Sequence, residues 1–429
     1  MNVLQVKELK NISWLVGGRI AQMILSLFIG ILTARYLGPS NYGLIGYATA
    51  YVAFFTSFCN LGINSVIIKN FVEYPNEQGE AIGTTIILRA ISSLISILSI
   101  LLIVLILDNK ELLTIHVTFL CSLALLFQVF DTINYWFQSK YQSKIPTIAT
   151  LIAYFVVSVY KVILLVLEKD VLWFAMSTSI DYFLIGAMLL ISYKKHNGPK
   201  LSFSFSKTKQ LLGKSYHYVL SGMMVAIYGQ TDRVMLKQLL DESQVGYYTI
   251  AVTVCGMWVF ILTAIIDSLY PTILQFHKRD KLLFEAKNRQ LYSIVFYLSI
   301  IISIIFLLFG KWIIGILYGQ DFMGAVAPLK IVTWYTAFSY LGVARNAWIV
   351  CEDKQVYLKY MYLGAAAINV LLNLIFIPNY GASGAAMASL ITQVFTSLIL
   401  PLCFKGMRPN VRLMIDAIML KDVIRKIKQ

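Results

Sequence analysis

Eleven ionisable side chains stand within stretches that are otherwise apolar, and they are the residues best suited to chemistry in this sequence. Seven are basic and four are acidic: Arg19, Arg89, Lys161, Arg233, Lys311, Lys330 and Arg345, with Asp131, Asp181, Asp232 and Asp267. A charge inside an apolar layer is costly, so such groups normally face a protein interior or a water-filled cavity. A cavity with this basic surplus attracts an anion, and guanidinium groups match phosphate oxygens in pairs. We therefore predict a site for an anionic ligand that carries phosphate.

Enzymatic motifs are missing from the sequence. It contains no HExxH and no CxxC pair, and its four histidines are scattered, so we predict no catalytic residue and no metal site. Leu212-Gly213-Lys214-Ser215 resembles the end of a phosphate-binding loop, but Thr208 stands where the leading glycine belongs. Without such a loop, movement of a ligand would be driven by an ion gradient, by a partner or by the ligand's own concentration difference.

The elements that hold these charges are predicted to be membrane-spanning helices. The chain has 429 residues, 59% hydrophobic and only 13% charged, whereas soluble domains have about a quarter of their residues charged. Repeated apolar runs of about 18 residues or more are long enough to cross a bilayer as helices. The predicted spans are 12–34, 42–68, 81–107, 112–138, 147–167, 171–193, 215–240, 246–274, 291–319, 325–351, 356–378 and 382–404. The predicted fold class is an all-α membrane protein with about twelve transmembrane helices.

The basic residues alternate between the loops of the predicted spans. Of the 36 Lys and Arg residues, 25 fall in alternate loops starting from the N-terminus, four in the opposite loops and seven within spans. Because positive charge is retained on the cytoplasmic side, this distribution predicts that both termini are cytoplasmic. It also accounts for the net charge of +15 without a nucleic-acid partner.

Two lobes are predicted from the position of the longest polar stretch. The proposed division is an N-terminal six-helix lobe over 1–193, a basic cytoplasmic linker over 194–214, and a C-terminal six-helix lobe over 215–404. Residues 37–43 and 240–246 open the second span of each lobe with similar sequences, as in parallel repeats whose substrate lies between the halves. Residues 405–429 are predicted to be a basic amphipathic tail on the cytoplasmic leaflet.

The topology assigns roles to the charged residues. Arg19, Arg89 and Arg345 fall in the cytoplasmic third of their spans, and with Arg233, Lys161 and Lys330 they are the predicted substrate-binding residues. The four aspartates are candidates for coupling to a proton or sodium gradient, or alternatively for pairing with basic neighbours between helices. Lys311, between Gly310 and Trp312, is interpreted as a side chain that reaches the headgroups.

Four segments together resemble the polysaccharide-type flippases of the multidrug/oligosaccharidyl-lipid/polysaccharide exporter superfamily. They are 34–50 (ARYLGPSNYGLIGYATA), 227–251 (IYGQTDRVMLKQLLDESQVGYYTIA), 266–274 (IDSLYPTIL) and 373–391 (NLIFIPNYGASGAAMASLI). The resemblance implies two six-helix lobes in a V shape that alternate access. It implies transfer of an undecaprenyl-diphosphate-linked oligosaccharide across the bacterial plasma membrane, for O-antigen or capsule synthesis. No cofactor is implied, and a polysaccharide polymerase is an expected partner.

Other functions remain open at the level of sequence. A cation-coupled multidrug exporter of the same superfamily would prefer an acidic cavity, which the basic surplus does not favour. A membrane enzyme of glycan assembly should carry a large outer loop with catalytic residues, and the predicted outer loops are short.

Overall fold

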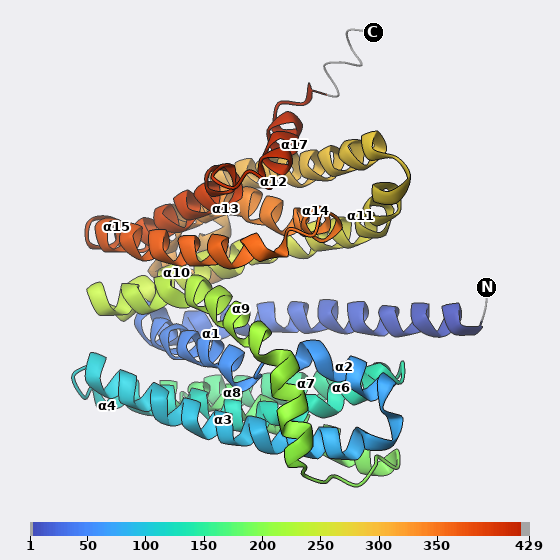
Figure 1. Ribbon diagram of the computed structural model, residues 1–429. Coiled ribbons are helices and arrows are strands. Elements are labelled where there is room, and N and C mark those ends of the chain that lie inside the picture. The colour runs from blue at the N-terminus through green and yellow to red at the C-terminus, as the bar shows by residue number, and fades with distance from the viewer. Residues whose placement is uncertain (1–2, 422–429) are drawn as a thin grey trace. The chain divides into compact units, whose positions relative to one another are not determined.

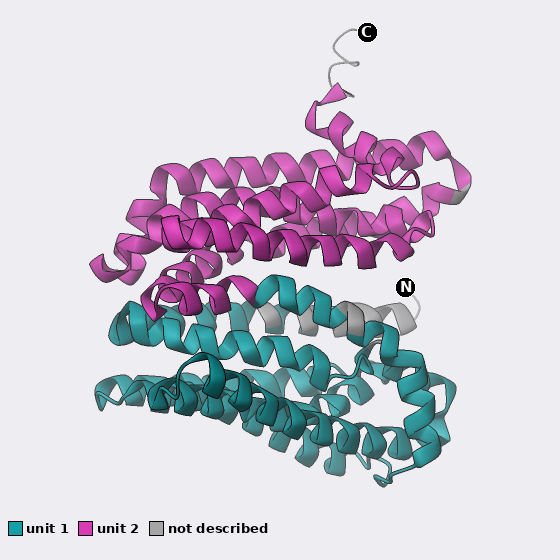
Figure 2. Ribbon diagram, turned by 60° about the vertical axis from the view of Figure 1, so that its left-hand side comes forward, with its two compact units in different colours: residues 1–230 teal, residues 231–429 magenta. Residues whose placement is uncertain are grey.

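A computed structural model describes residues 3–421, apart from the side chains of residues 1–13, 15, 16, 19, 65, 220, 221 and 278. Throughout this described part the regular structure is helical, without strands (Figure 1). The chain divides into two compact units, residues 1–230 (unit 1) and 231–429 (unit 2) (Figure 2). The prediction of an all-α membrane protein is confirmed.

Unit 1 consists of long helices that correspond to the first predicted spans. Its helices are α1 (Val3–Cys59), α2 (Asn64–Glu73), α3 (Gln78–Leu107), α4 (Leu112–Ser122), α5 (Ala124–Phe127), α6 (Asp131–Ser139), α7 (Lys144–Val166) and α8 (Val171–Lys195), with short 3-10 turns at Pro75–Glu77 and Gln128–Phe130. Helix α9 (Phe205–Leu239) begins in unit 1 and ends in unit 2. Trp136, Phe137 and Tyr193 form part of the buried core, where α6 and α8 pack together with α2.

Unit 2 repeats this helical organisation. Its helices are α10 (Glu242–Gly256), α11 (Val259–Arg279), α12 (Lys281–Tyr318), α13 (Val326–Ala344), α14 (Asn346–Cys351), α15 (Leu358–Val394), α16 (Leu400–Leu402) and α17 (Arg408–Ile418), with 3-10 turns at Gln320–Ala325 and Gln355–Tyr357 and a π-helical turn at Phe395–Ile399. Its core includes Phe284, Tyr292, Trp348 and Met414.

Eight stretches of the described residues are long and apolar enough to cross a membrane. Two of them, Ile20–Cys59 and Gln355–Leu402, are 40 and 48 residues long, and each overlaps two predicted spans. A glycine with positive φ divides each stretch: Gly38 has φ 71° and Gly381 has φ 56°. The predicted spans 215–240 and 325–351 correspond to α9 and to α13 with α14. The chain is therefore a multi-pass membrane protein.

The polar stretch 194–214, predicted to be a basic linker, is mostly helical. Helix α8 continues to Lys195 and α9 begins at Phe205, so only the residues between them lack helical structure. The helix extends into the polar sequence because Leu211 and Lys207 are both buried, and Lys207 forms an ion pair with Glu77.

The C-terminal tail is amphipathic as predicted, but its apolar face contacts protein. Helix α17 buries Val411, Leu413, Met414 and Ala417, in the same core as α12. Hydrogen bonds hold it there: the Ser293 hydroxyl donates to the carbonyl of Ala417 at 3.1 Å. The predicted place of the tail on the cytoplasmic leaflet stays a prediction, and residues 422–429 lie outside the described part.

Replacing Gly381 with alanine is expected to destabilise unit 2 by about 1–3 kcal/mol, because the backbone there has a conformation that side chains rarely adopt. A Cβ atom would also lie 2.5 Å from Oε1 of Gln244, which accepts a hydrogen bond from the Ala382 amide. Thermal unfolding of the purified protein measures the loss. Gly315→Ala is the matched control, since nothing lies within 4 Å of its Cβ position in α12. Equal behaviour of the two variants would contradict the prediction.

Candidate functional site

Asp232, on α9, is the most deeply buried of the predicted acidic residues, with 3% of its surface exposed. Four side chains donate hydrogen bonds to its carboxylate. The hydroxyls of Tyr248 and Ser389 both reach Oδ2. The amides of Asn369 and Asn373 reach Oδ1 at 3.2 and 2.7 Å. Each of the two carboxylate oxygens thus accepts hydrogen bonds from two donors.

The local sequence explains how these partners converge. Asn369 and Asn373 are four residues apart, so they lie on one face of α15. Gly381 then breaks α15, and the chain returns with Ser389 on its second half. Tyr248 lies on α10, which starts where the Asp241 side chain accepts a hydrogen bond from the Gln244 amide at 3.0 Å. The carboxylate therefore connects α9, α10 and both halves of α15.

The partners of Asp232 are neutral groups, which makes the site suited to an ion. A buried charge without an opposite charge is costly, even with good hydrogen bonds. Oδ1 of Asn373 is buried and has no hydrogen-bond partner within the described residues. A hard cation such as sodium prefers oxygen ligands, and the Asp232 carboxylate, the Tyr248 and Ser389 hydroxyls and Oδ1 of Asn373 could supply them. Protonation of the carboxylate would remove the charge as well. Among the described residues there is no cluster of three or more His, Cys, Asp or Glu that would hold a metal ion.

Tyr248, Asn369, Asn373 and Ser389 were not anticipated from the sequence. Two asparagines at a spacing of four, in a span of otherwise apolar residues, were the available signal, since a buried amide also needs partners.

The remaining predicted residues of unit 2 lie elsewhere. Arg233 and Lys330 are half-buried, and Asp267 is exposed on α11. None of the three is among the hydrogen-bonding partners of Asp232 in the described structure. Their predicted roles stay predictions.

Arg345 is buried at the end of α13 and contacts the backbone of the π-helical turn. Its guanidinium donates to the carbonyls of Thr396 and Ser397, both at 3.4 Å. The Ser397 hydroxyl donates in turn to the carbonyl of Phe338 at 2.8 Å. In this conformation Arg345 connects α13 to an irregular turn, so its predicted role in substrate binding stays a prediction and the structure adds a role in packing.

Arg89, on α3, is 2% exposed, and its guanidinium is surrounded by polar side chains of unit 1. It donates to the side-chain oxygens of Asn60 and Asn64, and to the Thr132 hydroxyl at 3.0 Å. Asn60 follows the end of α1 and Asn64 begins α2, so Arg89 bridges a break in the second predicted span. Asp131 attracts it electrostatically, as the alternative of pairing between helices predicts.

Lys161 and Asp181 also interact electrostatically, from the neighbouring helices α7 and α8. One carboxylate oxygen of Asp181 is buried without a hydrogen-bond partner among the described residues. The structure thus brings together Arg89 with Asp131, and Lys161 with Asp181. The side chain of Arg19 lies outside the described part, although α1 contains its backbone.

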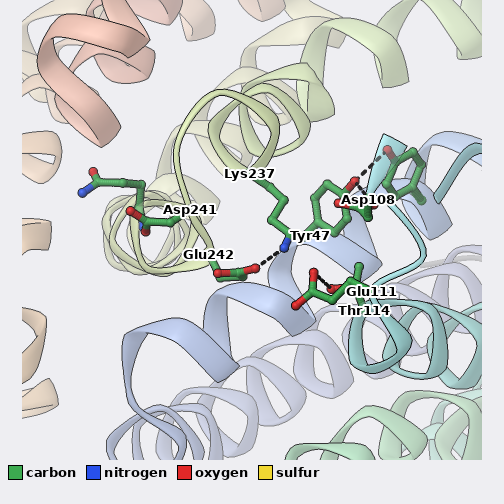
Figure 3. Close-up of polar contacts among 9 residues, drawn as sticks. Tyr47, Asp108, Glu111, Thr114, Lys237, Asp241 and Glu242 are labelled. Carbon is green, nitrogen blue, oxygen red and sulfur yellow. Dashed lines mark hydrogen bonds and ion pairs between the residues drawn. The ribbon is translucent and has the colours of Figure 1, made fainter. Parts of the chain in front are cut away.

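Polar contacts also fix several turns at the helix ends (Figure 3). In unit 1 the Tyr47 hydroxyl donates to Asp108 at 2.8 Å, and Thr114 donates to Glu111 at 2.7 Å. In unit 2 Lys237, in the last turn of α9, forms an ion pair with Glu242 at the start of α10, across the break between the two helices. These contacts hold the short connections that the sequence predicts to be outer loops.

Comparison with known proteins identifies the family. A family model described as "Polysaccharide biosynthesis protein" matches residues 9–277. The "Putative O-antigen transporter" of Salmonella typhi is 27% identical over 130 residues, which are 30% of this chain and 28% of that protein. "Probable flippase AglR" of Haloferax volcanii is 24% identical over 182 residues, 40% of this chain and 37% of that protein. These matches thus span between a quarter and two fifths of the curated relatives.

Solved structures show the same fold. "Lipid II flippase MurJ, inward closed conformation" has a TM-score of 0.69 at 16% identity, over 96% of this chain and 93% of that chain. An inward-facing multidrug resistance MATE family transporter of the MOP superfamily has a TM-score of 0.67 at 14% identity, over 92% and 95%. The resemblance predicted from the sequence is confirmed: the chain belongs to the family of polysaccharide biosynthesis proteins, and it has the fold of these solved transporters.

Proposed function

We propose that this protein moves an undecaprenyl-diphosphate-linked oligosaccharide from the cytoplasmic to the outer leaflet of the bacterial plasma membrane, for surface polysaccharide synthesis. The family match over residues 9–277 carries the proposal. The printed names of the two curated relatives, an O-antigen transporter and a flippase, support this substrate class. A polysaccharide polymerase would then consume the repeat units delivered to the outer leaflet.

The basic residues would bind the diphosphate during alternating access. Arg19, Arg233, Lys161 and Lys330 are the proposed phosphate ligands. Arg89 and Arg345 also hold helices in place through the internal contacts described above. A diphosphate carries charge that pairs of N–H donors neutralise well, whereas an organic cation would be repelled by the same groups.

Asp232 is the proposed coupling residue. Sodium or a proton at this carboxylate would offset a buried charge whose partners are neutral. Its contacts join α9, α10 and α15, so occupancy by the ion would alter the relative stability of two arrangements of these helices. An ion gradient would in this way bias the transport cycle. The alternation of basic loops supports cytoplasmic termini.

Loss of the protein is expected to leave lipid-linked oligosaccharide on the cytoplasmic leaflet. Arg19→Ala should slow export about 10- to 100-fold, because a phosphate ligand loses a charged hydrogen-bond donor. Both effects are measured by the access of a membrane-impermeant lectin or glycosidase to the lipid-linked glycan in spheroplasts.

Lys311→Ala provides the matched control, since this exposed lysine on α12 has no proposed contact with substrate. Outer-leaflet glycan at the wild-type level in the deletion strain would refute the proposed function. Normal export by Arg19→Ala at a normal protein level would remove Arg19 from the phosphate ligands.

A further inference from the structure

The residues between α8 and α9 form a non-helical segment that packs against α3, which we call the strap (residues 198–204; the green loop that leads into α9 in Figure 1). The Ser202 amide donates to the carbonyl of Gly79 at 3.4 Å. The Ser204 amide donates to the hydroxyl of Thr84 at 3.0 Å. The Tyr193 hydroxyl donates to the carbonyl of Pro199. The strap therefore packs against the first turns of α3.

Two glycines in α3 allow this close approach. A Cβ atom on Gly79 would lie 2.2 Å from the carbonyl oxygen of Lys200. A Cβ atom on Gly83 would lie 2.4 Å from the carbonyl oxygen of Ser202. Any larger residue at either position would push the backbone of the strap away from the helix.

Large apolar side chains of the strap and of the start of α9 are exposed. Leu201 and Phe203 lie in the strap and Phe205 is the first residue of α9; they are 43%, 48% and 81% exposed. The two phenylalanine rings lie edge to face, with centroids 6.2 Å apart. Three large apolar side chains on a fixed backbone form an exposed patch of the kind that marks an interaction site.

The charges around this patch indicate its partner. Lys194, Lys195, Lys200 and Lys209 are exposed on either side of it. Lysine next to aromatic residues suits an anionic membrane surface, where rings enter the boundary of the acyl chains and ammonium groups contact phosphate. The strap also joins two long helices at an end where the basic loops lie, so a leaflet is within reach.

We propose that the strap docks into the headgroup layer of the cytoplasmic leaflet and binds anionic phospholipid. Leu201, Phe203 and Phe205 enter the acyl boundary, and the four lysines contact lipid phosphates. The strap thereby anchors unit 1 to the leaflet next to the start of α9. This inference does not depend on the cargo of the protein.

Photocrosslinking of the full-length protein in nanodiscs tests this directly. Benzoylphenylalanine replaces Phe203 or Phe205, and replaces Ser204 as the control, in discs of phosphatidylcholine with or without phosphatidylglycerol. Positions 203 and 205 are expected to give lipid adducts by mass spectrometry, with phosphatidylglycerol enriched over its share of the disc. Position 204 should crosslink within the protein. Protein adducts alone at 203 and 205, including adducts to a second copy of the chain, would overturn the proposal.

Two further variants separate the contribution of the lysine charges to lipid binding from that of the packing of the strap against α3. Replacing the four lysines with glutamine should reduce the preference for phosphatidylglycerol, by about fivefold for each lysine that contacts the surface. Gly83→Leu should displace the strap from α3, and the fraction of lipid adducts at position 203 should therefore fall. Gly213→Leu is its control, because nothing lies within 4 Å of that Cβ position. An unchanged lipid preference after removal of the lysines would also refute the proposal.

Discussion

Asp232→Asn is expected to abolish ion-coupled export while leaving most of the protein in the membrane. The substitution keeps the size of the side chain but removes the charge that would bind the ion. It also replaces the charged acceptor of the Tyr248 hydroxyl and the Asn373 amide with a neutral side-chain amide, so their hydrogen bonds are no longer charge-assisted. Export is measured in cells by the surface accessibility of the glycan, against protein level by immunoblot.

Ion binding itself has a separate readout in the thermal stability of the purified protein. An ion that binds only the folded state stabilises it by about 2.7 kcal/mol at a hundred times the dissociation constant. The wild-type protein should therefore show a sodium-dependent rise in Tm that Asp232→Asn lacks. A response to pH alone, with none to sodium, would identify the proton as the ion.

Asp267→Asn tests the other coupling candidate of unit 2 in the same assays. Both aspartates lie in predicted spans of unit 2, but Asp267 is exposed on α11 whereas Asp232 is 3% exposed. Asp267→Asn should export normally. If it fails as severely as Asp232→Asn, or if Asp232→Asn exports at the wild-type rate, the assignment of the coupling site is wrong.

Arg89→Ala is expected to lower the free energy of unfolding by about 1–3 kcal/mol, the cost of leaving buried hydrogen-bond acceptors without their donor. The change removes the donor to the side-chain oxygens of Asn60 and Asn64, and with it the electrostatic attraction between Arg89 and Asp131. Because those asparagines stand on either side of the break between α1 and α2, the loss should loosen the second span first. Thermal unfolding and the steady-state protein level both report it.

Arg89→Lys and Lys311→Ala complete this comparison. Lysine keeps the charge but not the planar fork of donors, so Arg89→Lys should lie between wild type and Arg89→Ala. Lys311 is exposed on α12, and its loss should change stability by no more than about 0.5 kcal/mol. A normal Tm for Arg89→Ala combined with lost export would instead favour the predicted role of Arg89 in substrate binding.

Much of the fold follows from the sequence because burial in lipid leaves a strong one-dimensional signal. Apolar runs predict where helices lie, since a spanning segment needs both length and internal hydrogen bonds. The breaks within the long helical stretches are less visible. The Gly38-Pro39 pair predicts a turn. The break at Gly381, in contrast, lies among small residues that are equally typical of close helix packing.

The candidate site was only half predictable. Asp232 could be predicted because a carboxylate within an apolar run costs free energy and is therefore usually functional. Its partners leave little trace, since Ser389 and the two asparagines are neutral and lie far along the chain. For Arg89 and Arg345, the sequence predicts that the side chains lie within membrane spans. It does not predict the oxygens to which they donate, because these depend on which helices pack together.

The separation of Asp232 from its partners has a consequence for biosynthesis. Tyr248 follows it by 16 residues, but Asn369, Asn373 and Ser389 follow by 137, 141 and 157. At about 5–20 residues per second, the ribosome needs roughly 7–30 s to produce them. During that interval the carboxylate has a single partner from its final site. Insertion of helix α9 should thus stay reversible, and open to quality control, until the last third of the chain has entered the bilayer.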